Sequence, residues 1–570
     1  MGTPAATTTL LAAPRVTAPG SGAAAIGRRA VAVLPAALLW TVVALPLGVI
    51  GWLATEGDAT WWAHLAATML PEYVLSTIVL CGGVGMLTLA MGTGAAWLVT
   101  VYRFPGRDVL QWAVILPLAM PAYVLAYAYT DLLQFTGPVQ TTLRAFTGWG
   151  WQDYWFPPIH SRGGAILVLS LALYPYVYVT ARAAFLDQAA CTTEVARTLG
   201  CGPWTAFWRV TLPAARPALV AGVTFVLMET LADLGAVRFF EVPTFTTGIY
   251  RAWYAMGSPG TAAQLALVLM SAVLALVVLE RNSRGEASFA APGMRKHAAN
   301  ATRLRGAAAL AALAATAAPL VLGFVLPALL LIGMALGSSD TIPLARLLKL
   351  IGTTLALAAA AAVLILAVAI IALYAARRGG QLGRALISAA TLGYAMPGIV
   401  IGVALLVTLG MVDRGLAAVA PGLLVSGSVV ALLYAYLVRF LAVAWNPLDA
   451  GMARIRGHLE DAARTLGCSP WRLLGRIHLP LLRPSLLGAA LLVMVDVLKE
   501  LPATLMLRPF NVDTLAVEAF LMATQERLDG AALPSLLIVA AGLAPVVLLC
   551  RMMAANQTPA AQGGAARSGS

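Results

Sequence analysis

The sequence predicts an all-α polytopic membrane protein with about twelve transmembrane helices, arranged as two parallel six-helix repeats. Of its 570 residues 60% are hydrophobic and 11% are charged, and the mean hydropathy is +0.85. Soluble domains contain about 45–50% apolar and about 25% charged residues, so the composition excludes a soluble enzyme. Apolar segments recur along the chain, and one polar segment occurs twice. These two observations give the number of helices and their arrangement.

The apolar segments are each long enough to cross a bilayer core, which needs roughly 20 apolar residues in a helix. They fall near residues 30–53, 73–101, 109–131, 163–186, 214–237, 261–280, 306–336, 350–375, 385–410, 420–446, 482–505 and 531–550.

Basic residues orient these segments. The formal net charge is +13. With the N-terminus inside, most of the lysines and arginines fall in the connections on the inner side, as the positive-inside rule requires. The basic residues lie between apolar runs rather than in one patch, which argues against nucleic acid as a partner. We therefore expect both ends of the chain in the cytoplasm and membrane lipid around the helices.

The expected organisation follows from these spans. The domains are a disordered cytoplasmic tail at 1–29, a first half at 30–280, a basic cytoplasmic linker at 281–305, a second half at 306–552 and a second disordered tail at 553–570. The five cysteines include no C-x-x-C pair and the five histidines are dispersed, so no metal site is predicted.

A duplication relates the two halves. The segment EVARTLGCGPWTAFWRVTLPAARP at 194–217 matches DAARTLGCSPWRLLGRIHLPLLRP at 461–484 at roughly half of its positions without a gap. A weaker echo pairs Ala119-Met120-Pro121 with Ala395-Met396-Pro397. Both repeats keep their order relative to the spans, so the halves are parallel rather than inverted.

The duplicated segment lies in two inner loops, at 190–217 and 457–484. In each loop a helix is expected to stop at a glycine, Gly200 or Gly467, because glycine tolerates the left-handed conformation that ends a helix. A second helix is expected to start at once, with Gly202 and Pro203 or Ser469 and Pro470 at its first positions, and to end by Pro213 or Pro480.

Such a compact polar unit suits a docking site for a cytoplasmic partner. A plain structural loop is an alternative. A DNA-reading helix-turn-helix is a poor one, because the helix pair is tethered between spans.

The loop pattern resembles the EAA loop of the membrane permeases of ATP-binding-cassette (ABC) importers, in which a short coupling helix seats on an ATPase subunit. The resemblance implies this coupling role for the matching positions. Two residues depart mildly from the pattern, since Val195 stands where the pattern has alanine and Asp461 where it has glutamate. The matching positions are Glu194, Ala196 and Gly200 in the first half and Asp461, Ala463 and Gly467 in the second.

Further stretches resemble the fused permease of bacterial ferric iron importers. They are METLADLGAV from Met228, TFTTGIYRAW from Thr244 and VLKELPATLMLRPF from Val497. Thiamine and 2-aminoethylphosphonate permeases share much of this architecture.

The resemblance implies a type I ABC importer-like fold and an inner-membrane permease that is not itself an enzyme. It also implies two ABC ATPase subunits at the inner loops and a periplasmic or lipid-anchored substrate-binding protein outside. No lysine follows a glycine as a phosphate-binding G-K-[ST] motif requires, so we expect no cofactor on this chain and ATP with Mg on the partner subunits.

Four carboxylates interrupt the apolar spans. Glu229 and Asp233 lie four residues apart, as do Asp496 and Glu500, and both pairs stand at the same offset from the duplicated loop. Ionisable groups inside a span are costly and are therefore functional candidates. We interpret these four as lining the outer part of a pathway that favours a cation such as Fe(III), which prefers oxygen ligands.

Three alternatives stay open for these acids and for the chain. Glu229 and Asp496 could satisfy polar neighbours in the bundle, while Asp233 and Glu500 are solvated at a helix end, the latter near Lys499. The acids could also relay protons in a twelve-span secondary carrier, although such a carrier would not need two EAA-like loops. A membrane enzyme is the third, and no His, Cys or carboxylate constellation supports it.

Overall fold

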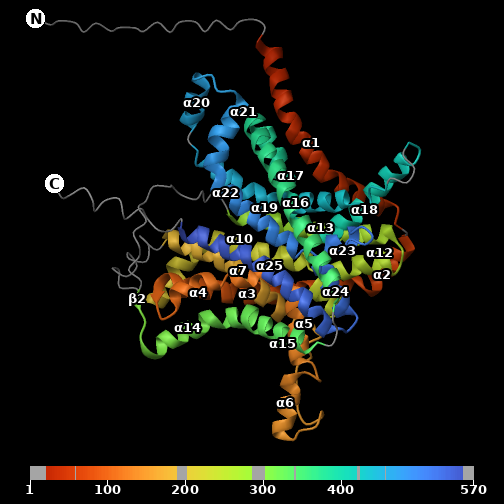
Figure 1. Cartoon of the computed structure of the whole chain (residues 1–570), viewed down its shortest axis with the longest axis vertical. Coiled ribbons are helices and arrows are strands. Elements are labelled where there is room, and N and C mark those ends of the chain that lie inside the picture. Colours follow the sequence, from red (N-terminus) through yellow and green to blue (C-terminus); the bar gives the residue numbers. More distant parts are fainter. Residues whose placement is uncertain are drawn as a thin grey trace, which may run out of the picture.

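The computed structural model describes residues 21–57, 59–188, 202–284, 302–338, 342–419, 424–455 and 457–555, and these are almost entirely helical (Figure 1). The first half comprises α1 (Ser21–Thr55), α2 (Ala59–Thr68), α3 (Leu70–Val101), β1 (Tyr102–Arg103), α4 (Arg107–Ala113), η1 (Leu116–Ala119), α5 (Ala122–Leu133), α6 (Pro138–Thr147), α7 (Arg162–Gln188), α9 (Pro203–Ala206), η2 (Phe207–Thr211), α10 (Leu212–Ala232), α11 (Gly235–Phe239), α12 (Phe245–Tyr254) and α13 (Pro259–Arg284).

The second half follows the same plan. It comprises β2 (Thr302–Arg303), α14 (Gly306–Leu320), η3 (Val321–Val325), α15 (Leu326–Gly337), α16 (Leu344–Arg378), α17 (Gly380–Ala390), η4 (Thr391–Ala395), α18 (Gly398–Leu416), α19 (Val429–Ala453), α20 (Gly457–Thr465), α21 (Pro470–Leu473), η5 (Leu474–His478), α22 (Leu479–Leu498), α23 (Pro502–Leu507), α24 (Leu515–Thr524) and α25 (Leu528–Ala555).

The predicted number of spans is confirmed. Within the described ranges, 11 helices are long and apolar enough to cross a membrane, and one bent helix pair brings the total to 12. That pair is the predicted third span. Its two parts, Arg107–Ala119 and Ala122–Thr147, meet at 93°, so the segment is not one straight helix.

The bend falls at the first copy of the repeated Ala-Met-Pro sequence, residues 119–121. Pro121 lacks a backbone N–H, and a proline also disfavours helical geometry at the residue before it. Met120 is accordingly extended, with ψ at 109°, and α5 begins directly after Pro121. In the second half the same three residues separate η4 from α18, with Met396 extended at ψ 125°. The predicted ninth span, 385–410, is thus divided as well.

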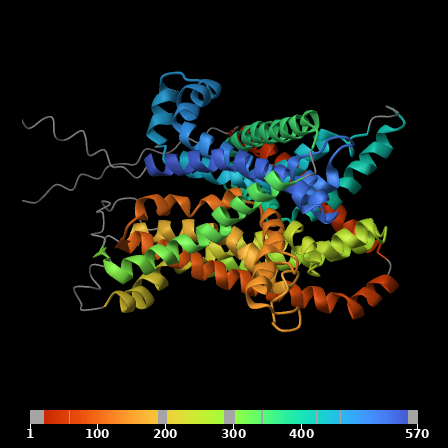
Figure 2. The same ribbon diagram turned by 60° about the horizontal axis from the view of Figure 1, so that its bottom comes forward.

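The first helix of each half packs against the other half. Helix α1 contacts its own α13 and also α16, α17 and α18, while α14 and α15 contact α25 and also α3, α4 and α5. Figure 2 shows α14, in light green, lying along the orange helices of the first half. A hydrogen bond between the halves supports each of these contacts. The Tyr434 hydroxyl donates to the Val42 carbonyl of α1 at 2.5 Å, and the Tyr129 hydroxyl donates to the Leu322 carbonyl of η3 at 2.7 Å.

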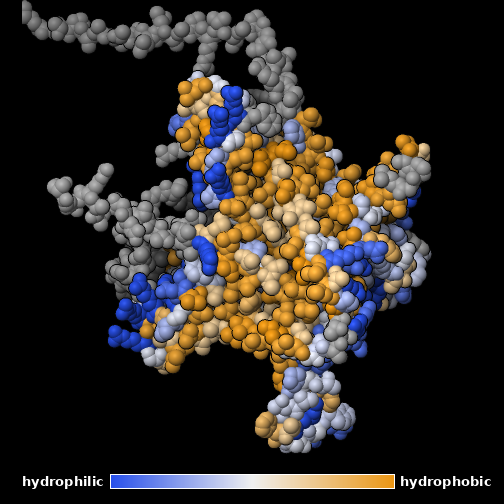
Figure 3. Space-filling model, viewed as in Figure 1, coloured by the Kyte–Doolittle hydropathy of each residue, from blue (hydrophilic) through white to orange (hydrophobic). Residues whose placement is uncertain are grey.

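Helices α7 and α19 lie at the centre of the molecule. In each of these two helices, 67% of an 18-residue apolar stretch is buried inside the protein. The corresponding share is 22% in α1 and α3, which face outward. Figure 3 shows the resulting surface, a broad apolar area with hydrophilic residues gathered at its ends, including over α20 and α21. This is the pattern expected of a protein whose middle faces hydrocarbon and whose ends face water.

One expected boundary differs from the structure. Helix α1 begins at Ser21, inside the segment 1–29 that was expected to be a disordered tail. The end of the basic linker is ordered, because Thr302 and Arg303 pair in parallel with Tyr102 and Arg103. This short ladder ties the start of the second half to the connection after α3.

Candidate functional site

The second copy of the duplicated loop ends its first helix as predicted. Gly467 has a φ of +72°. The N–H groups of Gly467 and Cys468 donate to the carbonyls of Arg464 and Ala463, each at 3.0 Å, which is the Schellman arrangement of a helix C-terminus. The next helix starts at Pro470, and the Ser469 hydroxyl accepts the Arg472 N–H at 3.4 Å. The predicted stop and restart are therefore confirmed.

The loop presents a mixed polar and apolar tip. Asp461 is exposed, while Ala463 is only 8% exposed and packs inward. Leu466, immediately before the glycine, is 86% exposed. An apolar side chain held out beside an exposed carboxylate, on a helix projecting from the bundle, suits a groove on another protein (Figure 1).

An ion-pair network fixes this loop to the bundle. Glu460, next to Asp461, pairs with Arg377 at the end of α16 and lies 3.2 Å from His478 Nε2 and 3.5 Å from Arg464. The Tyr374 hydroxyl in turn contacts His478 Nδ1. Sequence reasoning missed this network because Arg377 and Glu460 lie 83 residues apart.

The first copy is described only from residue 202 onward. Glu194, Ala196 and Gly200 lie outside the described residues. Pro203 begins α9 as predicted. The rings of Phe207 and Trp204 both pack on Trp97, with ring centroids 4.7 Å and 5.8 Å away, and Trp204 is 62% exposed.

The prediction that the second loop helix ends by Pro213 or Pro480 is wrong. In both halves the chain passes through a π-helical turn, η2 or η5, and continues without interruption into α10 or α22. Each proline stands just after its π-turn, at a first-turn position of the next helix. The wider turn accommodates a residue that lacks an N–H and would clash with the preceding turn of an α-helix. The described part of each loop is thereby continuous with a span that leads to the acidic residues.

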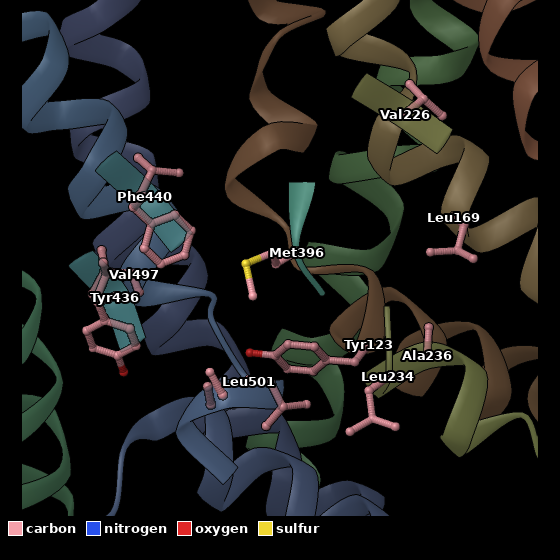
Figure 4. Packing of buried hydrophobic residues seen from close by; sticks show 14 of the residues in the cluster. Tyr123, Leu169, Val226, Leu234, Ala236, Met396, Tyr436, Phe440, Val497 and Leu501 are labelled. Atoms are coloured by element: carbon pink, nitrogen blue, oxygen red, sulfur yellow. The ribbon is translucent and has the colours of Figure 1, made fainter. Parts of the chain in front are cut away.

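All four predicted carboxylates meet at one cavity of about 90 Å³. Glu229 and Asp233 reach it from α10 and the break that follows, and Asp496 and Glu500 reach it from α22 and its own break. The duplication thus places equivalent acids on facing elements, as predicted from their common offset. Figure 4 shows this region, with Tyr123 of the first half pointing toward Leu501 of the second.

Both acidic spans stop earlier than expected. Helix α10 ends at Ala232 and α22 at Leu498, and short separate helices, α11 and α23, follow. The Asp233 carboxylate accepts the Val237 N–H at 3.0 Å. The Glu500 carboxylate accepts the N–H groups of Ala503 and Thr504, each at 3.0 Å. These carboxylates satisfy the free donors at helix starts, which explains why the breaks fall here.

The alternative of a solvated Glu500 near Lys499 is wrong. Glu500 is only 4% exposed, and its ionic partner is Arg439, with 3.4 Å between Arg439 Nη1 and Glu500 Oε1. Gly398 makes this pairing possible, because a Cβ there would lie 2.2 Å from Arg439 Nη1 and 2.7 Å from Glu500 Oε1.

The other two acids have different partners. Asp496 lies 2.9 Å from Lys499 Nζ, and Glu229 accepts a hydrogen bond of 2.7 Å from the Tyr394 hydroxyl. Glu229 and Asp233 of the first half are therefore held by a hydroxyl and a backbone N–H, whereas both second-half acids face a cation. The charge of the cavity is unevenly divided between the halves.

Two cationic side chains line the cavity beside the acids, Arg439 and Lys499. Arg439 lies inside a predicted span, and an arginine within an apolar run is itself a signal that sequence reasoning could have used. With four carboxylates and two cations, the lining carries an excess of negative charge when all groups are ionised. The described residues include no group of three or more His, Cys, Asp or Glu placed to hold a metal ion, so the acids form a separated series rather than a preformed metal centre.

Comparison with known proteins agrees with this architecture. The family model for the binding-protein-dependent transport system inner membrane component matches the chain twice, over residues 86–279 and 369–561. An Fe(3+)-transport system permease protein of Haemophilus influenzae is 24% identical over 488 residues, covering 84% of this chain and 90% of that protein.

Two relatives from Escherichia coli match shorter stretches. A sulfate transport system permease protein is 27% identical and covers 35% of this chain and 69% of its own length. A molybdenum transport system permease protein is 27% identical and covers 34% of this chain and 85% of its own length.

The two family matches cover most of the chain and fall one in each structural half. The relatives are transport permeases rather than enzymes. The chain belongs to the family of binding-protein-dependent transport system inner membrane components, as a multi-pass inner-membrane permease subunit of an ABC importer with both halves fused.

Proposed function

We propose that this permease moves ferric iron from the periplasm to the cytoplasm through the cavity between its halves. The observation that carries the proposal is the cavity lining, in which four carboxylates outnumber two cationic groups. Oxygen ligands suit a hard cation, and their separation suits passage rather than tight retention. The resemblance to an iron permease along most of the chain supports the same substrate.

Oxyanions are the main competing substrates, because sulfate and molybdenum permeases are among the relatives. An oxyanion entering this cavity would meet Glu229 and Asp233 without a paired cation. Arg439 and Lys499 are engaged by Glu500 and Asp496, so binding an oxyanion would require two ion pairs to break. The charge of the cavity therefore favours a cation.

The energy for transport comes from outside this chain. We propose that two ABC ATPase subunits, which hold ATP and Mg, dock on the two inner loops. Glu194, Ala196 and Gly200 of one loop and Asp461, Ala463 and Gly467 of the other would carry the coupling role. A substrate-binding protein delivers iron from the opposite side, and both termini are cytoplasmic. Closure of the ATPase pair moves the loops, and the continuous helices η2–α10 and η5–α22 carry that movement to the acidic breaks.

Uptake in cells tests the substrate. A strain lacking its own iron importers would express this permease with its cognate ATPase and binding protein, and would receive radiolabelled ferric iron. Parallel cultures would receive labelled molybdate, sulfate, thiamine or 2-aminoethylphosphonate. We expect iron uptake that an ATPase-inactive partner abolishes. Uptake of one of the other solutes, without uptake of iron, would identify that solute as the substrate. Iron uptake that persists without the ATPase but stops with a protonophore would favour a proton-coupled carrier.

A further inference from the structure

Tyr123 lines the cavity together with the four carboxylates. It lies in the first turn of α5, directly after the break at Met120-Pro121, and it is 4% exposed. The 93° bend of the third span carries this turn away from the line of α4 and places Tyr123 in the cavity lining. The break in the predicted span is thus what brings a phenol to the acids.

The ring of Tyr123 is held between the two halves. A Cβ added at Gly235 would lie 2.9 Å from Tyr123 Cβ and 3.0 Å from Leu501 Cδ2. The glycine therefore provides the space in which a first-half tyrosine approaches a second-half leucine. Figure 4 shows the ring extending from its helix toward the elements that carry Leu501 and Val497. Packing from both sides fixes the position of the phenol.

The hydroxyl of Tyr123 is buried and has no hydrogen-bond partner among the described residues. Each charged side chain of the lining, by contrast, has a partner, and the Tyr176 hydroxyl accepts from Lys499 at 3.4 Å. A buried hydroxyl without a partner costs free energy comparable to a lost hydrogen bond. Because Tyr123 is a lining residue of the cavity, a substrate that enters can offer its hydroxyl a partner without breaking an existing hydrogen bond.

We propose that the Tyr123 hydroxyl contacts the substrate during transport and raises the apparent affinity of the cavity for it. This inference rests on ferric iron as the substrate. A phenol oxygen can bind a hard cation directly, or it can hydrogen-bond to water that the cation carries. In either case the substrate supplies the partner that the hydroxyl lacks, and the neighbouring carboxylates supply the charge.

The contact is confined to the first half. Ile399 stands two residues after Pro397, as Tyr123 stands two residues after Pro121, and Ile399 is fully buried and apolar. Glu229 and Asp233, whose hydrogen-bond partners are a hydroxyl and a backbone N–H rather than a cation, belong to the first half too. One half therefore supplies the substrate-facing oxygens, while the other supplies ion pairs.

The same helix offers a matched control. Tyr127 lies one turn after Tyr123, and its hydroxyl is likewise buried without a partner among the described residues. Tyr127 is not part of the cavity lining. Replacing either tyrosine with phenylalanine removes one oxygen and keeps the ring. A difference in transport between the two variants is therefore due to the position of Tyr123 in the cavity lining and not to the loss of a buried hydroxyl in general.

The experiment measures uptake of radiolabelled ferric iron against concentration in proteoliposomes that hold the complete complex with ATP inside. Equal membrane amounts and equal thermal unfolding of the variants verify folding. We expect Tyr123→Phe to lower kcat/KM about tenfold, chiefly through KM, since one hydrogen bond to a charged group is lost. Tyr127→Phe should stay within about twofold of the wild type.

Three results would overturn the proposal. Equal kinetics for Tyr123→Phe and the wild type would refute the contact while leaving iron as the substrate. An equal loss in both variants would assign the effect to helix packing. A wild-type complex that accumulates no iron would refute the substrate itself, and the tyrosine contact with it.

Discussion

Asp233 and Glu500 hold equivalent positions in the two halves, and each accepts backbone hydrogen bonds from the short helix that follows it. Both halves therefore have a carboxylate at the break between two helices, where it accepts N–H groups at the start of the second helix. Glu500 has in addition become buried and paired with Arg439. The two equivalent acids therefore share a structural role and differ in their electrostatic one.

Loss of the Glu500 carboxylate should destabilise the protein. Glu500→Ala leaves Arg439 buried without its partner and removes the cap of α23, for which we expect a cost of about 3–5 kcal/mol. Unfolding of the purified permease by a denaturing detergent measures this. Asp233→Ala is the matched control and should cost less, about 1 kcal/mol, because its main loss is one cap. Equal stability of both variants would contradict the assigned ion pair.

Charge at Glu229 should matter for transport more than for folding. Glu229→Gln keeps an oxygen that can accept the Tyr394 hydroxyl and removes only the negative charge. We expect iron uptake to fall about tenfold at unchanged expression, as charge-assisted contacts are worth roughly 1.5–3 kcal/mol. Glu72→Gln, an exposed acid paired with Arg162 on the surface, should transport normally. Normal uptake by a folded carrier with all four cavity acids neutralised would refute their role in the pathway.

The left-handed backbone at Gly467 predicts which substitutions break coupling. Gly467→Val cannot easily take a φ of +72°, so the loop should distort, and uptake should be abolished while the permease stays in the membrane. Gly467→Asn is the matched control, because asparagine tolerates this conformation and should retain most uptake. Uptake assays with immunoblots of the membrane fraction decide the matter. Normal uptake by the valine variant would argue against a coupling role.

The Glu460 network should keep the second loop firmly attached to the spans. Glu460→Ala removes the shared partner of Arg377, Arg464 and His478. We expect more ATP hydrolysed per iron transported, by about threefold or more, because the loop can then move without moving α22. The ratio of phosphate released to iron accumulated measures this coupling. A ratio equal to that of the wild type would show that the network is only structural.

Much of the fold could be predicted from the sequence because its signals are local. The number of apolar spans, the restart at Pro470 and the stop at Gly467 depend on neighbouring residues, and all three were confirmed. The duplication supplied the equivalence of the acidic pairs. The bend at Pro121 was detectable as a Met-Pro pair, but its 93° angle depends on packing against α15 and α7 and could not be derived.

The partners of the acids could not be predicted, because they are distant in sequence. Tyr394 lies 165 residues from Glu229 and Arg439 lies 61 residues from Glu500. Pattern reasoning gives the face on which a residue lies, yet not what packs there from another helix. For the same reason the uneven charge of the two halves and the position of Tyr123 appear only in the structure.

Accumulation of ferric iron by the purified complex in proteoliposomes tests the central claim most directly. Wild-type permease would be compared with Glu229→Gln/Asp496→Asn, each assembled with its ATPase and binding protein and with ATP inside. We predict ATP-dependent iron accumulation by the wild type and its loss in the double variant. Accumulation of molybdate or sulfate in place of iron, or unchanged iron transport by the double variant, would contradict a cation pathway lined by these acids.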